Sequence, residues 1–166
     1  MTDPKDDMLC ALRDAYAMER YAERLLRNHA TRSIPYPEVN AHIEAHLTET
    51  LAHQKSLASC LERIDESNVI LQTLTDDFGA AIETSNVVQT PDEVVKSLVT
   101  LYVIKHQEIA SYTSLIAIAE ARGFFETKLA CEAIVLRQIA MADWLLDRLP
   151  AATKAYLGRG ARPAES

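Results

Sequence analysis

The stretch TPDEVVKSLVTLYVIKHQEIASYTSLIAIAEARG, residues 90–123, decides the fold, because it reads as one long amphipathic helix with a clear start and a clear end. Thr90 is a good N-cap residue, Pro91 suits the first helical position, and Glu93 stands three residues after Thr90. This combination is a capping box. Gly123 is the residue type that most often terminates a helix. The sequence therefore predicts a helix over nearly the whole stretch.

Charged residues interrupt the apolar stripe of this helix. Lys105 and Glu108 fall on the stripe, and Glu108 lies between Leu101 and Tyr112, so its carboxylate is expected to point inward. A buried carboxylate without a partner is costly or takes up a proton. Glu108 therefore needs a cation, a hydrogen-bond network or a metal ion, and Lys105 either pairs with such a carboxylate or extends to solvent. The apolar members of the stripe include Val94, Leu98, Leu101, Tyr112, Leu115 and Ala119.

Three more long helices are expected, over residues 5–30, 36–65 and 124–149, the last ending before Pro150. Residues 66–91 are less regular, and we expect a crossover there that carries one short helix. Strand patterns are missing. Four long helices with one long connection predict an all-α fold, a ferritin-like up-down four-helix bundle with a long crossover.

Length and composition limit the possible functions. The 166 residues suit a single domain, predicted as a bundle over residues 1–157 with a frayed tail over 158–166. The net charge of −7 argues against binding to nucleic acid or to an anionic membrane surface. No apolar run is long enough to span a bilayer, and the acidic N-terminus is unlike a signal peptide, so a cytoplasmic location is expected.

The other helices also carry polar residues on their apolar faces. Glu19 lies at the middle of the first helix, on the face that carries its leucines. On the second helix, Glu49 and His53 are one turn apart, within a strip that also holds two other histidines. On the fourth helix Gln138 is expected to point inward, and Glu132 lies on the flank of the apolar stripe.

Together these residues suggest a metal site. Hard or borderline divalent cations prefer oxygen and imidazole ligands that converge from several helices. A di-iron bundle usually supplies Glu from two helices and Glu-x-x-His from two others, whereas this chain has Glu-x-x-x-His on the second helix and no His on the fourth. The alternative is that each Glu is a boundary residue or is satisfied by hydrogen bonds.

Four strings carry a family resemblance. The chain resembles the YciE/YciF-like ferritin-like proteins, which are bacterial stress-associated proteins, and the strings cover nearly the whole chain in the family's order. They are RDAYAMERYAERLL (13–26), AHIEAHLTETLAHQKSLASCLERI (41–64), HQEIASYTSLIAIAEARG (106–123) and ACEAIVLRQIAMADWLLDRLPAAT (130–153).

The resemblance implies a ferritin-like bundle, a homodimer and a dinuclear metal site. Glu19, Glu49, His53 and Glu108 match the family's metal-binding positions. The fourth helix departs from the family pattern, because Arg137 and Gln138 stand where the family usually carries adjacent acidic residues. This departure puts the second metal ion in doubt and leaves Glu132 as the acidic candidate on that helix.

Two functions follow from the sequence. The first is a metal-binding protein with one or two iron or manganese ions per chain, acting as an oxidoreductase on oxygen or peroxide; zinc suits the same ligands. The second is a non-enzymatic, dimeric stress protein whose metal site is degenerate and whose buried carboxylates are satisfied by Lys, Arg, Tyr and water.

Overall fold

The computed structural model describes residues 3–32, 36–65 and 92–160. Every secondary-structure element in these ranges is an α-helix, and none of these helices is both long enough and apolar enough to span a membrane. The helices are α1 (Pro4–Arg32), α2 (Pro37–Ile64), α4 (Glu93–Arg122) and α5 (Phe125–Gly160).

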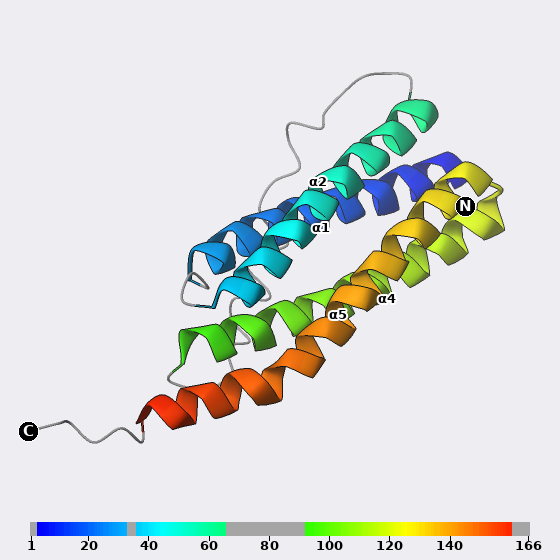
Figure 1. Ribbon diagram of the computed structural model, residues 1–166. Coiled ribbons are helices and arrows are strands. Elements are labelled where there is room, and N and C mark those ends of the chain that lie inside the picture. The colour runs from blue at the N-terminus through cyan, green and yellow to red at the C-terminus, as the bar shows by residue number, and fades with distance from the viewer. Residues whose placement is uncertain (1–2, 33–35, 66–91, 161–166) are drawn as a thin grey trace, which may run out of the picture.

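The helices form two antiparallel hairpins, α1 with α2 and α4 with α5, that pack together with α1 beside α4 and α2 beside α5 (Figure 1). The α1 and α4 helices run in opposite directions, because Asp7 near the start of α1 pairs with Arg122 at the end of α4, with 2.8 Å between Oδ2 and Nη2. At the other end of the bundle, His29 Nδ1 lies 2.7 Å from Ser97 Oγ. Consequently α2 and α4 run in the same direction. The predicted four-helix bundle is confirmed, while the expected long crossover and its short helix lie outside the described residues.

The ends of α4 show one prediction that failed and one that held. The N-cap is Asp92 and not Thr90, because the Asp92 carboxylate accepts hydrogen bonds from the backbone N–H groups of Val94 (2.8 Å) and Val95 (3.0 Å). A carboxylate at this position also interacts favourably with the positive end of the helix dipole. Gly123 ends the helix as predicted, with a φ of 80° that only glycine adopts without strain.

The prediction that the last helix ends before Pro150 is wrong, since α5 continues to Gly160. Proline removes one helical hydrogen bond and normally kinks or ends a helix. Here the following turns are held by tertiary contacts. Ala152 is buried, and the Arg159 guanidinium lies 4.9 Å from the centre of the Tyr36 ring. The helix thus extends beyond the predicted domain boundary at residue 157.

The core of the bundle is divided along its length. One apolar cluster lies toward the start of α1, and a second lies toward its end. Each fully buried leucine in them contributes roughly 1.5–3 kcal/mol of transfer free energy. Between the clusters lies a layer of buried polar side chains, which we call the polar layer. Its residues are Glu19, Thr50, His53, Lys105, Glu108 and Gln138.

Candidate functional site in the bundle core

Glu19 of α1 is at the centre of the polar layer and is fully buried. Its Oε1 accepts hydrogen bonds from Tyr112 Oη at 2.7 Å and from Gln138 Nε2 at 2.9 Å. His53 Nδ1 lies 3.4 Å from the same oxygen. Burial and the adjacent Glu19 carboxylate raise the pKa of Tyr112 well above its usual value, so the phenol stays a neutral donor.

Lys105 of α4 supplies a buried positive charge to the layer. Its Nζ lies 2.5 Å from Glu108 Oε2, and both side chains are fully buried. The same ammonium donates a hydrogen bond to Gln138 Oε1 at 2.9 Å. Burial raises the pKa of Glu108 to about 7, with a further increase from the Glu19 charge, although Lys105 acts in the opposite direction. The two buried carboxylates are therefore balanced in part by a lysine and in part by proton uptake.

Gln138 of α5 connects the two carboxylates. An ammonium group only donates hydrogen bonds, and an ionised carboxylate only accepts them. The Gln138 amide fits both neighbours in one orientation, with its oxygen toward Lys105 and its nitrogen toward Glu19. An aspartate or glutamate there would have to face the Glu19 carboxylate without a donor between them. The inward position predicted for Gln138 is confirmed, and the side chain acts as a bridge between charges.

The five predicted metal ligands separate into two groups. Glu19, His53 and Glu108 are buried in the polar layer. The side chains of Glu49 and Glu132 are 41% and 43% exposed, and the structure does not bring them to the layer. Glu132 Oε1 lies 3.8 Å from Lys128 Nζ, on the flank that its position in the stripe predicts.

Glu49 is outside the layer because the buried face of α2 differs from the strip that holds His42. The buried positions follow 46, 50, 53 and 57, so Thr50 points inward and its neighbour Glu49 lies at the edge. Sequence reasoning missed Thr50, although its spacing from His53 and Leu57 places it on the same face.

His46, also on this buried face, is only 3% exposed. Burial, and then the nearby positive charge of Lys105, lower the pKa of His46 to about 2, so its ring is neutral. The 3.0 Å contact between His46 Nδ1 and Glu49 Oε2 is therefore a hydrogen bond from a neutral imidazole. This bond, together with Arg137 Nη1 at 3.9 Å, holds Glu49 at the edge of the bundle.

Several buried atoms of the layer lack a hydrogen-bond partner within the described part of the chain. They are Glu19 Oε2, both carboxylate oxygens of Glu108, His53 Nδ1 and Thr50 Oγ1; for Glu108 Oε2 the close Lys105 contact does not have hydrogen-bond geometry. Buried oxygens of this kind bind water or a cation. The polar layer thus has more hydrogen-bond acceptors than donors, and the net charge of the layer decides whether these acceptors bind water or a cation.

The layer does not fit a dinuclear metal centre. Within residues 3–32, 36–65 and 92–160, no three His, Cys, Asp or Glu side chains are grouped so that they would hold a metal ion. Two divalent ions bring four positive charges, whereas the layer has two carboxylates and already contains the Lys105 ammonium. A divalent ion about 4 Å from that ammonium would be repelled by on the order of 8 kcal/mol at an effective dielectric constant near 20. The position expected for a metal ion is therefore next to a protein cation.

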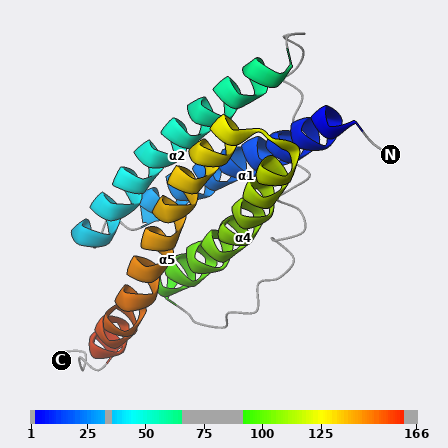
Figure 2. The ribbon, with the colours of Figure 1, turned by 90° about the vertical axis from the view of Figure 1, so that its right-hand side faces the viewer.

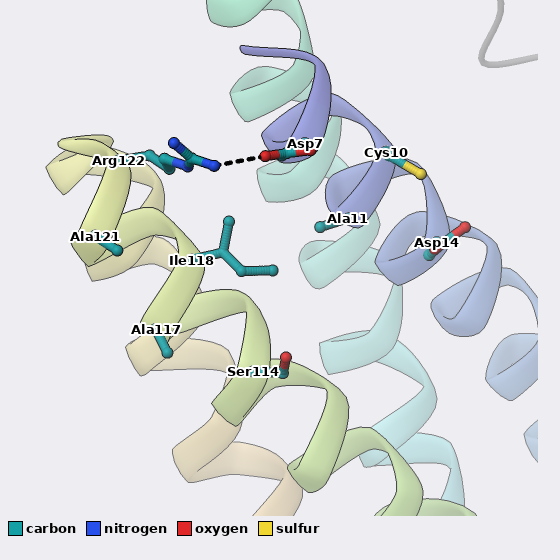
Figure 3. A pocket seen from close by; sticks show the side chains of 9 residues that line it. All are labelled: Asp7, Cys10, Ala11, Asp14, Ser114, Ala117, Ile118, Ala121 and Arg122. Atoms are coloured by element: carbon teal, nitrogen blue, oxygen red, sulfur yellow. Dashed lines mark hydrogen bonds and ion pairs between the residues drawn. The ribbon is translucent and has the colours of Figure 1, made fainter. Parts of the chain in front are cut away.

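A groove lies apart from this layer, between the start of α1 and the end of α4 (Figure 3). Its volume is about 570 Å³, and small side chains such as Ala11, Ala117 and Ala121 form much of its lining. Asp7 and Arg122, at its rim, form an ion pair with each other. The lining has no histidine, and of its two carboxylates Asp7 is paired with Arg122, so the core remains the candidate site.

Comparison with known proteins identifies the family. Residues 4–158 match the family described as "Domain of unknown function (DUF892)". The chain belongs to the DUF892 family. A solved structure of a protein from Xanthomonas campestris pv. campestris is similar to this DUF892 chain with a TM-score of 0.80 and 32% identity, covering 96% of this chain and 100% of the other.

The E. coli stress protein YciF has the same fold. Its structure matches this DUF892 chain with a TM-score of 0.77 and 21% identity, covering 93% of this chain and 99% of YciF. The resemblance to YciE/YciF-like proteins that the four strings indicate is therefore confirmed, and so is the bundle fold.

Proposed function

We propose that this DUF892 protein is a non-enzymatic helical-bundle protein whose core works without a metal ion. The observation that carries the proposal is the contact of Lys105 Nζ with Glu108 Oε2, 2.5 Å apart and fully buried. In this arrangement the lysine provides the positive charge that a metal ion would otherwise bring to the carboxylates. Tyr112 and Gln138 donate hydrogen bonds to Glu19 Oε1. In this proposal water satisfies the remaining carboxylate oxygens.

The charge count supports this function. The layer contains the carboxyl groups of Glu19 and Glu108 and the ammonium group of Lys105. Because the pKa of Glu108 is raised to about 7, Glu108 is partly protonated near neutral pH, and the layer is close to neutral. A buried layer that is close to neutral is stable without an added cation, whereas one with a surplus of carboxylates is not. The E. coli relative is described as a stress protein, and we place this chain in the same general role, as a structural protein and not as a catalyst.

A second candidate function has one specific observation in its favour. Glu19 Oε2 and His53 Nδ1 are buried and have no hydrogen-bond partner within the described residues. These atoms are suitable ligands for a single iron or manganese ion. A metal-binding protein with oxidoreductase activity toward oxygen or peroxide would need at least one such bound ion. Such an ion would require the Lys105 ammonium to move away or lose its proton.

Metal analysis separates the two candidates. The protein, purified without a metal-affinity tag, is loaded anaerobically with ferrous or manganous ion, and metal per chain and melting temperature are measured with and without a chelator. We expect substoichiometric metal and an unchanged melting temperature, because a ligand that binds only the folded state must stabilise it. About one ion per chain, with a melting temperature lowered by the chelator, would support the second candidate instead.

The matched variant for this assay is Lys105→Glu. It replaces the buried cation with a third carboxylate beside Glu19 and Glu108, and His53 supplies an imidazole close by. We expect this variant to be less stable than the wild type and to regain stability when manganous ion is added. Metal binding by the variant but not by the wild type would assign the absence of binding to Lys105 itself.

A further inference from the structure

The hydrogen bond between Tyr112 and Glu19 joins an oxidisable side chain to a base inside the bundle. Tyr112 Oη donates to Glu19 Oε1 at 2.7 Å, and both side chains are fully buried. This length is typical of a strong hydrogen bond from a hydroxyl group to a carboxylate. Tyr112 lies on the second half of α4, which runs beside the first half of α1 (Figure 2). The contact is therefore set by the packing of two different helices.

A buried phenol that loses an electron needs an acceptor for its proton. Without one, the product is a phenol radical cation, and an isolated positive charge in the core is costly. Glu19 Oε1 already accepts the phenolic hydrogen of Tyr112, so the proton can move along the existing hydrogen bond without any rearrangement of side chains. The products are then a neutral tyrosyl radical and a neutral carboxylic acid, and no new charge is created in the core.

The surroundings of Glu19 accommodate the added proton. Gln138 Nε2 donates to Glu19 Oε1 at 2.9 Å, and a carboxylic acid retains the capacity to accept this bond. Glu19 Oε2 is buried and has no hydrogen-bond partner within the described residues, so it loses none. The Lys105 ammonium is in direct contact with Glu108 and keeps that carboxylate as its partner. Protonation of Glu19 therefore leaves these contacts in place.

We propose that Tyr112 is a redox site that gives up one electron to an oxidising radical while its phenolic proton moves to Glu19. One electron leaves the chain and reduces the radical, the O–H bond of Tyr112 breaks, and an O–H bond forms on the Glu19 carboxylate. An electron from a one-electron reductant such as ascorbate, with return of the proton, restores the starting state. The inference goes beyond the proposed function, because it adds a redox site to a core that works without a metal ion.

Burial protects the radical once it has formed. Tyr112 has no exposed surface and belongs to the apolar cluster near the start of α1. A second protein molecule cannot reach the ring to couple with it, whereas electron transfer does not require contact with the ring. The site is therefore suited to hold an oxidising equivalent and not to bind a substrate.

Tyr36 is a buried phenol without these features. Its Oη is buried but has no hydrogen-bond partner within the described residues. The Arg159 guanidinium lies 4.9 Å from the centre of the Tyr36 ring, and a positive charge at that distance opposes the loss of an electron from the ring. Tyr36 has no proton acceptor in contact and an unfavourable charge nearby, so it is the matched control for Tyr112.

One-electron oxidation of the full chain tests the site. Chelator-treated protein is mixed with hexachloroiridate(IV), which takes an electron but no proton, and is frozen for electron paramagnetic resonance. All samples carry Cys10→Ser, because that exposed thiol would also be oxidised. We expect a tyrosyl radical signal that is largely lost when Tyr112→Phe is added and is kept when Tyr36→Phe is added. Circular dichroism checks that each variant is folded. No tyrosyl signal before either change, or an undiminished signal with Tyr112→Phe, would overturn the proposal.

Glu19→Gln tests the proton acceptor. The amide keeps an oxygen that accepts the Tyr112 hydrogen bond, but it does not take up the proton. We expect the tyrosyl signal, followed in samples frozen after increasing times, to form about tenfold or more slowly than with Glu19 in place. With Glu19 in place the reaction should also be slower in heavy water, an effect that a role of Glu19 in packing alone would not produce. Equal rates with Glu19 and with Gln at this position, or no isotope effect, would contradict proton transfer to Glu19.

Discussion

The two apolar clusters and the polar layer between them occupy the same core but hold the helices together differently. In the clusters, residues such as Leu57 and Leu98 are fully buried among other aliphatic side chains. The polar layer is equally buried but contains ionisable side chains, namely those of Glu19, Lys105 and Glu108. The apolar contacts are non-directional, whereas each polar group depends on one specific partner.

This difference shows where the fold tolerates change. An apolar cluster that loses one methyl group loses the transfer free energy of that group and a further amount for the cavity left behind. A polar layer that loses one member leaves a buried charge without a partner, while replacing the pair together is often neutral. The apolar clusters therefore supply most of the free energy of folding, and the polar layer makes one alignment of the four helices preferable to others.

The largest effect is expected from Lys105→Met. The variant keeps the length of the side chain but removes the ammonium, so Glu108 is buried without a cation and Gln138 Oε1 loses its donor. We expect the free energy of unfolding to fall by about 4 kcal/mol. Urea denaturation monitored by circular dichroism measures it.

The double variant Lys105→Met with Glu108→Leu is the control for this effect. Both charges are then replaced by apolar groups of similar volume, and stability should return to within about 1 kcal/mol of the wild type. If Lys105→Met alone lowers stability by less than about 1 kcal/mol, the buried ion pair is not the principal contact of the layer.

A somewhat smaller loss is expected from Leu57→Ala in the apolar cluster near the start of α1. Leu57 is fully buried, and the substitution leaves a cavity among well-packed neighbours. The free energy of unfolding should fall by about 3 kcal/mol. The same urea titration should show that no second substitution in the polar layer restores this loss.

Gln138→Leu should have an intermediate effect. The substitution keeps the volume but removes the acceptor of Lys105 and one donor to Glu19. We expect a loss of about 2 kcal/mol, since two charged groups each lose one hydrogen bond while keeping another partner. Gln138→Glu is the comparison, because it keeps the acceptor for Lys105 but places a second carboxylate beside Glu19. A loss for Gln138→Leu as small as that of a surface substitution would show that the bridge is dispensable.

The smallest effect concerns pH. Burial raises the pKa of Glu108 to about 7 from an ordinary value of 4.5, so the folded protein keeps a proton that the unfolded chain releases. The resulting stabilisation is fully present below the unfolded pKa and is lost as the pH rises through the folded pKa. Glu108→Gln does not titrate. Its stability relative to wild type should therefore increase by about 1 kcal/mol between about pH 6 and pH 7.

Subtraction of the two stabilities isolates the Glu108 contribution. The lowered pKa of His46 has the opposite effect on stability, because this histidine takes up a proton when the protein unfolds in acid. The effect is the same in the wild type and in Glu108→Gln, so it cancels in the difference. A stability difference that does not change with pH would show that Glu108 stays ionised throughout, as the partner of Lys105.

The sequence predicted the helices better than the side chains of the site. Gly123 ends α4 because its backbone conformation is a local property, and the inward positions of Glu19 and Glu108 follow from helical periodicity. The continuation of α5 past Pro150 was not predictable, because it depends on packing around Ala152 and on the distant Tyr36 ring.

By itself the sequence determined the four helices, their buried faces apart from the polar part of α2, and the presence of carboxylates in the core, because each of these depends on residues a few positions apart in one helix. Only the tertiary structure decided the partners of those carboxylates. A lysine at the edge of an apolar stripe can extend to solvent or turn inward. Lys105 turns inward because Glu108 lies one turn away and Gln138, on a different helix, offers it an acceptor. A choice that depends on a residue across the bundle is settled by packing.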